Sequence, residues 1–305
     1  MELTTIFYYT DEFCKLFEKN FIAEFGHNLL SDGDGVRNRS ICLSASEIMT
    51  ILIYYHSSGY KTFKSYYTKS HELTRAFNLP SYNRFIEIQN KVAIHLELFI
   101  KLIISYAKCD GISFIDSFPL RVSHIKRSSS HKVFRKTAKK GKTSTGWFYG
   151  FKIHIVINGY GDILDFIITP GNIADNNHSL ILEITKNLFG KIFGDKGYLL
   201  KQSLFEKLYI NGKHIVTKKR KNMKNKLMDM TDKMGLKKRG IIETVGAVLK
   251  EDLNIEHSRY RSPKTLFINV FAALIAYAFR EKKPSIYGHE KQEKNECISA
   301  LLMNA

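Results

Sequence analysis

The chain has 305 residues, of which 44% are hydrophobic and 25% charged, so it is long enough for one large globular domain or two ordinary ones. Its four cysteines lie far apart with no Cys-x-x-Cys pair, which argues against a disulfide framework and a structural zinc site. No apolar run reaches the ~18 residues of a membrane span, and the acidic N-terminus lacks the basic start of a signal peptide. We therefore expect a cytoplasmic protein with no membrane partner.

The first hundred residues are predicted to be mainly helical. Ser44 and Glu47 have the spacing of a capping box that begins a helix, and a turn at 57–60 separates this helix from a second one. Such a pair could form a DNA-reading unit, although any helical bundle contains similar pairs. A long helix is predicted for about 82–107, where apolar residues recur at spacings of three and four. Residues 1–110 contain 12 basic and 12 acidic residues, so this region could bind DNA ends or mediate dimerisation.

After Gly111 the pattern changes to strands that alternate with helices. Strands are predicted at 112–116, 147–157, 163–169, 191–195 and 213–217. Helices are predicted after a cap at Asp175 or Asn176, at 201–209, at 240–253, and at 265–279 after a cap at Ser262. The basic stretch 121–146 lacks apolar periodicity and is predicted to be a flexible loop. A hairpin followed by strand–helix units implies an α/β protein whose mixed sheet has helices on its faces.

Two basic runs carry most of the formal net charge of +18. Residues 121–142 include nine basic and no acidic residues, and residues 213–239 include eleven basic and two acidic ones. Runs this dense repel themselves unless a polyanion neutralises them, so nucleic acid is the favoured partner and a solvated basic surface is the alternative. An anionic membrane is less favoured because neither run has an amphipathic pattern.

Three carboxylates are candidates for a metal site. Asp116 and Asp195 each follow a short apolar strand, so neighbouring strands would bring them together at one edge of the sheet. Glu243 lies at the margin of an apolar helix face, from which it could turn toward the sheet. Converging carboxylates need a counter-charge, and Mg²⁺ or Mn²⁺ would supply it while leaving positions open for phosphate and water. The alternative for Asp116 is that it caps a turn.

The chain resembles the DDE transposases of bacterial insertion sequences over almost its whole length, and its sequence motifs are most similar to those of the insertion sequence 982 family. Five motifs occur in the typical order, and they read FIDSFPL, YGFKIHIV, ITPGNIADNNHS, GDKGY and the spacing Arg239-x3-Glu243-x6-Lys250. In related transposases a tyrosine often stands three residues before the arginine, where this chain has Leu236.

This resemblance implies an RNase H-like catalytic domain with Asp116, Asp195 and Glu243 as the catalytic, metal-binding triad. It implies two Mg²⁺ or Mn²⁺ ions as cofactors, and a reaction that cuts DNA at the ends of the element and joins the freed 3′-OH to target DNA. Double-stranded DNA is the expected partner, bound by a homodimer or larger synaptic complex. The predicted DNA-binding residues are Arg239, Lys250, Lys126, Arg127, Lys219 and Arg220.

The predicted organisation has a helical N-terminal region at 1–110, a catalytic domain at 111–283 and a flexible tail at 284–305. Two other functions stay open, namely an RNase H-like nuclease without strand transfer and a non-catalytic DNA-binding protein. Asp175 fits a helix cap better than a fourth metal-site acid. Trp147, the single tryptophan, is expected in the core rather than stacked on an unpaired base.

Overall fold

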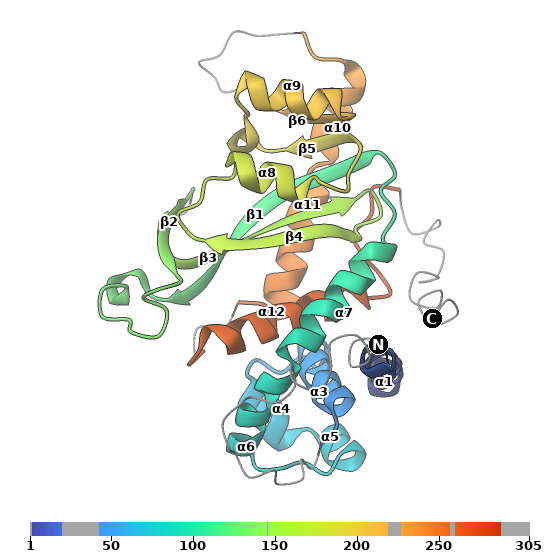
Figure 1. Ribbon diagram of the computed structural model, residues 1–305, viewed down its shortest axis with the longest axis vertical. Helices are drawn as coiled ribbons and strands as arrows, with labels where there is room; N and C mark the ends of the chain where they lie inside the picture. Colours follow the sequence, from blue (N-terminus) through green and yellow to red (C-terminus); the bar gives the residue numbers. More distant parts are fainter. Residues whose placement is uncertain (1, 20–42, 145, 219–226, 257–259, 288–305) are drawn as a thin grey trace.

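The computed structural model describes residues 2–19, 43–144, 146–218, 227–256 and 260–287. Within these ranges six strands form one mixed sheet, and the N-terminal helices lie below it in Figure 1. The strands are β1 (Ile112–Ser123), β2 (Lys139–Thr143), β3 (Gly146–Asn158), β4 (Ile163–Pro170), β5 (Gly190–Gly194) and β6 (Lys213–Thr217).

The strand order β4–β3–β1–β5–β6 joins an antiparallel half of the sheet to a parallel half. β1 pairs antiparallel with β3, which pairs antiparallel with β4, whereas β5 and β6 run parallel to β1. β2 pairs with the first residues of β3, ahead of the stretch that pairs with β4. This order is that of an RNase H-like sheet, so the predicted fold class is confirmed.

Two apolar cores cover the two faces of the sheet. Along β1, Phe114 faces one core and Ile115 the other, because successive side chains of a strand point to opposite faces. The helices on the first face are α7 (Ala93–Tyr106), α10 (Met230–Lys238), α11 (Gly240–Ala247) and α12 (Pro263–Ala278). The helices on the second face are α8 (His178–Ile184) and α9 (Gln202–Ile210). Since helices cover both faces, the accessible part of the sheet is the edge where its strands end.

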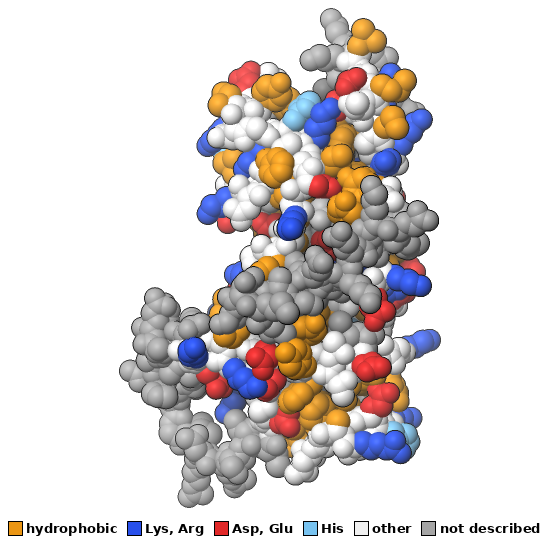
Figure 2. All heavy atoms as spheres, turned by 90° about the vertical axis from the view of Figure 1, so that its right-hand side faces the viewer, with side chains coloured by type: hydrophobic (Ala, Val, Ile, Leu, Met, Phe, Trp, Pro, Cys, Tyr) orange, Lys and Arg blue, Asp and Glu red, His pale blue; other side chains and the backbone are white. Residues whose placement is uncertain are grey.

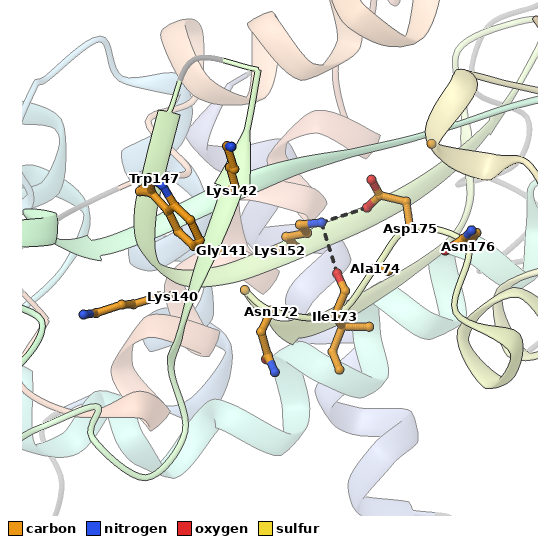
Figure 3. Close-up of a pocket in the computed structure, with 12 residues that line it drawn as sticks. Lys140, Gly141, Lys142, Trp147, Lys152, Asn172, Ile173, Ala174, Asp175 and Asn176 are labelled. Carbon is orange, nitrogen blue, oxygen red and sulfur yellow. Dashed lines mark hydrogen bonds and ion pairs between the residues drawn. The ribbon is translucent and has the colours of Figure 1, made fainter. Parts of the chain in front are cut away.

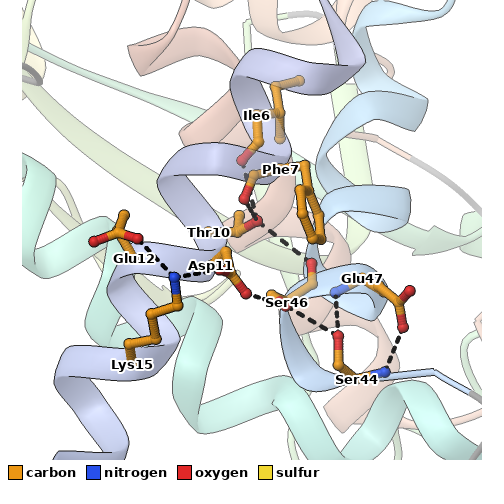
Figure 4. Close-up of polar contacts among 9 residues, drawn as sticks. All are labelled: Ile6, Phe7, Thr10, Asp11, Glu12, Lys15, Ser44, Ser46 and Glu47. Atoms are coloured by element: carbon orange, nitrogen blue, oxygen red, sulfur yellow. Dashed lines mark hydrogen bonds and ion pairs between the residues drawn. The ribbon is translucent and has the colours of Figure 1, made fainter. Parts of the chain in front are cut away.

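The N-terminal helices form a bundle, as predicted. They are α1 (Leu3–Phe17), α3 (Ala45–Ser57), α4 (Phe63–Lys69), α5 (His71–Ala76) and α6 (Tyr82–Ile88). The capping box is present, with Glu47 N donating to Ser44 Oγ at 3.1 Å and Ser44 N donating to the Glu47 carboxylate at 2.6 Å (Figure 4). Ser46 joins α3 to α1 by donating to Asp11 at 3.0 Å. The helix predicted at 82–107 is interrupted by a 3-10 turn, Gln89–Val92, between α6 and α7.

Helix α12 connects this bundle to the sheet. Its predicted cap is present, since the Ser262 side chain accepts a backbone N–H of the first turn at 3.1 Å. α12 packs against α3 and α7, and Phe279 just beyond it meets the ring of Phe99. On its other side Phe267 meets the ring of Phe151 in β3. Among the described residues, no helix combines the length and the hydropathy that crossing a membrane would require.

The flexible loop predicted at 121–146 is wrong for the two ends of the stretch, which belong to β1 and β2, whereas residues 124–138 between them form turns and one 3-10 turn. β1 continues through Pro119, and the stretch then forms a 3-10 turn and strand β2. Phe134 is fully buried, with its ring 6.1 Å from that of Phe151. β1 can continue because β5 pairs only with Ile112–Phe114, which leaves its later residues at a free edge where a proline without an N–H is tolerated.

The segment before residue 240, which belongs to the second basic run, contains helix α10. The helix predicted at 240–253 consists of α11 and a π-helical turn, Val248–Asp252. Arg239 lies at the junction of α10 and α11, so two short helices meet beside the sheet instead of one long helix.

Candidate active site

Asp116 and Asp195 meet where the parallel strands β1 and β5 separate. The two strands pair residue by residue, with Phe114 opposite Phe193. Continuing this register by two residues places Asp116 opposite Asp195, which directly follows β5. Asp116 lies within β1 rather than at its end, since β1 continues along β3 after β5 has ended. The structure therefore brings these two predicted acids together at the edge of the sheet.

Arg239 links Asp116 to Glu243, the third predicted acid. The Nη1 atom of Arg239 lies 3.3 Å from Asp116 Oδ2, and its Nη2 atom forms an ion pair with Glu243. The side chain of Glu243 is 60% exposed, whereas that of Arg239 is 19% exposed. The guanidinium thus supplies a positive charge between two of the three acids.

The environment of Asp116 favours its protonated form. Burial raises the pKa of Asp116 to about 6. A hydrogen bond from Ser117 N at 2.8 Å and the Arg239 guanidinium act in the opposite direction, while the charges of Asp195 and Glu243 raise this pKa further. The three acids therefore share one electrostatic site, and an added cation there would favour the ionised carboxylate.

Asp175 is a fourth carboxylate of this site. Neither predicted cap of α8, Asp175 or Asn176, is the cap, because the Asn177 side chain accepts a backbone N–H of the first turn at 3.1 Å. Asp175 instead accepts from Ser117 Oγ at 2.8 Å and from Lys152 Nζ at 3.1 Å. These contacts hold it beside β1 and β3, on the side where Asp116 lies.

Gly197 lets Asp175 and Asp195 approach the same turn. Asp195 Oδ1 accepts a hydrogen bond from Gly197 N at 2.7 Å. A Cβ atom at Gly197 would lie 2.9 Å from Asp195 Oδ1 and 3.2 Å from Asp175 Oδ2. A larger residue would push these carboxylates away, so the glycine of the GDKGY motif has a steric role.

Buried polar side chains lie beneath the acids. Lys152 is 8% exposed, and besides Asp175 its ammonium contacts the Ile173 carbonyl at 3.0 Å. His154 is fully buried with Nε2 3.0 Å from Thr169 Oγ1, and burial lowers the pKa of His154 to about 4, so the ring is neutral at pH 7. Sequence reasoning assigned neither residue to the site. The available signal was the occurrence of two polar residues at alternate positions of an otherwise apolar strand.

A groove of about 450 Å³ opens between β1 and α11 beside Asp116 and Glu243. Lys250 lines it, with its ammonium 4.7 Å over the ring of Phe118, and burial lowers the pKa of Lys250. Arg239 lies at the junction of α10 and α11, whereas Lys250 lies in the π-helical turn that follows α11. The positive charges of both side chains nevertheless interact with the Asp116 carboxylate. The structure therefore places these two predicted DNA-binding residues at the acidic site.

Comparison with protein families shows where the chain belongs. The family model of the transposase DDE domain matches residues 106–263, which is more than half of the chain. The chain belongs to this family. The match extends from the residues before β1 to the start of α12 and includes all four carboxylates. No curated protein matches the chain. Membership implies a role in DNA transposition, DNA as a partner, and a nuclease or transesterase activity.

DDE transposases typically use divalent metal ions, and the donor atoms of this DDE domain suit them. Carboxylate oxygens are the ligands that Mg²⁺ and Mn²⁺ prefer, and four carboxylates are gathered here. As the described side chains stand, no three histidine, cysteine or acidic groups lie close enough together to hold an ion. The Arg239 guanidinium lies between two of these acids, Asp116 and Glu243.

Of the other four predicted DNA-binding residues of the DDE domain, the structure describes two. Lys126 and Arg127 are exposed in the 3-10 turn that follows β1. Lys219 and Arg220 lie outside the described residues. On the face shown in Figure 2, the basic side chains that the structure describes are interspersed with acidic ones. On that face the positive charge is therefore distributed among many side chains.

Proposed function

We propose that this protein is a transposase that cleaves DNA at the ends of a bacterial insertion sequence and joins those ends to target DNA. The observation that carries the proposal is the meeting of Asp116 and Asp195 at the edge of two parallel strands, with Glu243 linked to Asp116 through Arg239. The five motifs similar to the insertion sequence 982 family support the type of element.

In this proposal the acids form the metal-binding and catalytic triad. Divalent ions held by Asp116, Asp195 and Glu243 would activate the attacking oxygen and stabilise the leaving oxygen. Asp175 stays on Lys152 and Ser117, where it orients the β1 backbone next to Asp116. Arg239 exchanges its carboxylate partners for a DNA phosphate, which its planar guanidinium matches in shape and charge.

Cleavage and joining are the same kind of displacement at phosphorus. Water is the nucleophile in the first step, and the freed 3′-OH is the nucleophile in the second. Lys250, held in the groove over Phe118, neutralises a phosphate beside the acids in both steps. The side chains therefore contribute mainly by positioning the DNA and by stabilising its charge.

The proposal assigns residues 1–110 to DNA-end binding or dimerisation and residues 111–283 to catalysis within a homodimer or larger complex. Of the predicted tail at 284–305, the described part includes Tyr287, whose hydroxyl donates to Asp110 at 3.0 Å. Residues 288–305 lie outside the described residues. Light scattering with and without a DNA end tests the oligomeric state, and a monomer in the DNA complex contradicts it.

The experiment that tests the function uses a labelled duplex carrying the terminal sequence of the element, with Mg²⁺, Mn²⁺ or EDTA. We expect nicking and strand transfer with either metal ion, and loss of both in Asp195→Asn. The matched control is Asp165→Asn on β4, because Asp165, like Asp195, is a half-buried acid that accepts a nearby backbone N–H, in its case from Phe166 at 2.8 Å. Cleavage without joining indicates a nuclease. Tight binding without cleavage under any metal indicates a DNA-binding protein and contradicts the proposal.

A further inference from the structure

Trp147 does not lie in the core, as its sequence context predicted, but is 62% exposed at the start of β3. The register of β2 and β3 places Lys142 directly opposite Trp147, and the Lys142 ammonium lies 5.7 Å from the centre of the indole ring (Figure 3). No other aromatic ring of the described residues stacks on it. An indole exposed in this way is a large apolar surface, and its contact with the Lys142 ammonium leaves most of it open to solvent.

Trp147 lines a cavity of about 480 Å³ that leads to the acidic site. One wall is the β2–β3 hairpin, with Lys140, Lys142 and Trp147, and the other wall is the loop at 171–176 (Figure 3). The hairpin and the loop touch at Gly141, where a Cβ atom would lie 2.2 Å from the Gly171 carbonyl oxygen. A bulkier residue at Gly141 would therefore separate the two walls.

The loop wall is held in place from below. Lys152 contacts both the Ile173 carbonyl at 3.0 Å and the Asp175 carboxylate at 3.1 Å, as Figure 3 shows. The inner end of the cavity is formed by Asp175 and Gly197, the residues that lie beside Asp195. The inner end of the cavity therefore borders the proposed active site through Asp175 and Gly197.

Unpaired positive charge lies at one end of the cavity. Lys140 and Lys142 lie on the hairpin side of the cavity near the indole ring, whereas the carboxylate of Asp175 lies at the inner end (Figure 3). A phosphate is favoured at the lysine end, whereas the Asp175 carboxylate at the inner end is already paired with the Lys152 ammonium and attracts a phosphate less. An aromatic ring beside two lysines offers a surface on which a base can stack and ammonium groups that neutralise the charge of its phosphate.

We propose that this cavity binds an unpaired nucleotide of the DNA strand, with its base stacked on Trp147 and its phosphate held by Lys140 and Lys142. The inference rests on the proposed function, because it supplies a place for the strand that leaves the acidic site. A fully paired duplex presents only the edges of its bases in the grooves, so it cannot cover the indole face. The volume of about 480 Å³ lies within the ~300–1,000 Å³ typical of sites that enclose a small ligand.

Trp147 is the single tryptophan of the chain, so tryptophan emission, excited at a wavelength that the tyrosines do not absorb, reports on this site alone. The full-length protein is titrated in EDTA with an oligothymidine and with a fully paired duplex, and binding of each is followed separately by the anisotropy of a label on the DNA. We expect saturable quenching of the tryptophan emission by the oligothymidine and little quenching by the duplex at equal occupancy. Equal quenching by both, or binding of the oligothymidine without quenching, overturns the proposal.

Variants separate stacking from general charge. We expect Trp147→Ala to weaken oligothymidine binding roughly tenfold and Trp147→Phe to weaken it less than about threefold, since a smaller ring still stacks. The matched control is Lys64→Ala, because Lys64 lies 5.9 Å over the ring of Tyr82 in the helical bundle, away from the cavity. Unchanged binding by Trp147→Ala, or an equal loss in Lys64→Ala, contradicts the proposal. If quenching occurs but the duplex ends are never cut, the proposed function fails and the nucleotide site stands.

Discussion

Replacing Asp116 by Asn should stabilise the protein when no divalent metal ion is present. Burial raises the pKa of Asp116 from its usual 3.8 to about 6, so folding disfavours the ionised carboxylate. A folded-state pKa above the unfolded-state value means that stability is lost as the pH rises from about 4 to about 6. Raising the pKa by two units lowers the free energy of unfolding by at most about 3 kcal/mol at pH 7.5. We expect Asp116→Asn to regain about 1–3 kcal/mol of this free energy.

Thermal and urea unfolding in EDTA at pH 7.5 and pH 4 measures this gain. At pH 4 the wild-type carboxyl is protonated in the folded state, so the difference between variant and wild type should shrink below about 1 kcal/mol. The low pKa of His154 makes stability fall as the pH decreases, in the opposite sense, but this contribution is common to both proteins and cancels. Added Mg²⁺ should then raise the melting temperature of the wild type and leave that of Asp116→Asn unchanged.

Asp165→Asn is the matched control for this experiment. Burial raises the pKa of Asp165 to about 6 as well, so its replacement should give a similar gain in EDTA. Because Asp165 lies on β4 away from the acids, Mg²⁺ should stabilise this variant as much as the wild type. If Asp116→Asn is less stable than the wild type in EDTA at pH 7.5, the carboxylate is stabilised by Arg239 overall, and the reasoning from burial is refuted.

Three further changes test the packing described above. Phe134→Ala should lower the free energy of unfolding by about 3–5 kcal/mol in urea titrations because it empties a fully buried site, whereas exposed Val133→Ala should change it by less than about 0.5 kcal/mol; similar effects would contradict an ordered basic segment. Ser44→Ala should cost about 1 kcal/mol through loss of the capping box, and no loss would show that the bundle does not depend on this cap. Lys152→Met should reduce cleavage more than Lys152→Arg, because it leaves Asp175 without its cation; equal rates in the cleavage assay would exclude this positioning role.

The acidic pair was predictable because its signal is local and repeated. Asp116 and Asp195 each follow an apolar stretch that can only be a buried strand, and parallel neighbours align such residues at one edge. The role of Arg239 as a bridge between acids was not predictable, because it depends on the break between α10 and α11. The apolar pattern of that region is compatible with one helix or two.

The errors have physical causes of their own. β2 has the sequence KKGKT, which lacks apolar alternation because the strand lies at an exposed edge, and its pairing with β3 is a long-range contact. Asp175, Asn176 and Asn177 are equally good caps in isolation, so only the contacts of Asp175 with β1 and β3 decide which one caps α8. Trp147 lies at the start of β3, in a part of the strand that extends beyond the core. An apolar sequence pattern does not imply burial there.

The position of α12 has a consequence for the synthesis of the protein. Helix α12 covers surfaces of α3 and α7, yet it is translated only after the whole sheet. The bundle formed by the first hundred residues is therefore completed only after the ribosome has made residues 263–278. Until then, the apolar side chains that α12 covers are exposed to solvent. A stop codon upstream of α12 removes that cover as well as the last helix. Truncated copies of the gene should accordingly give N-terminal fragments that are degraded instead of folded fragments that compete with the full-length protein.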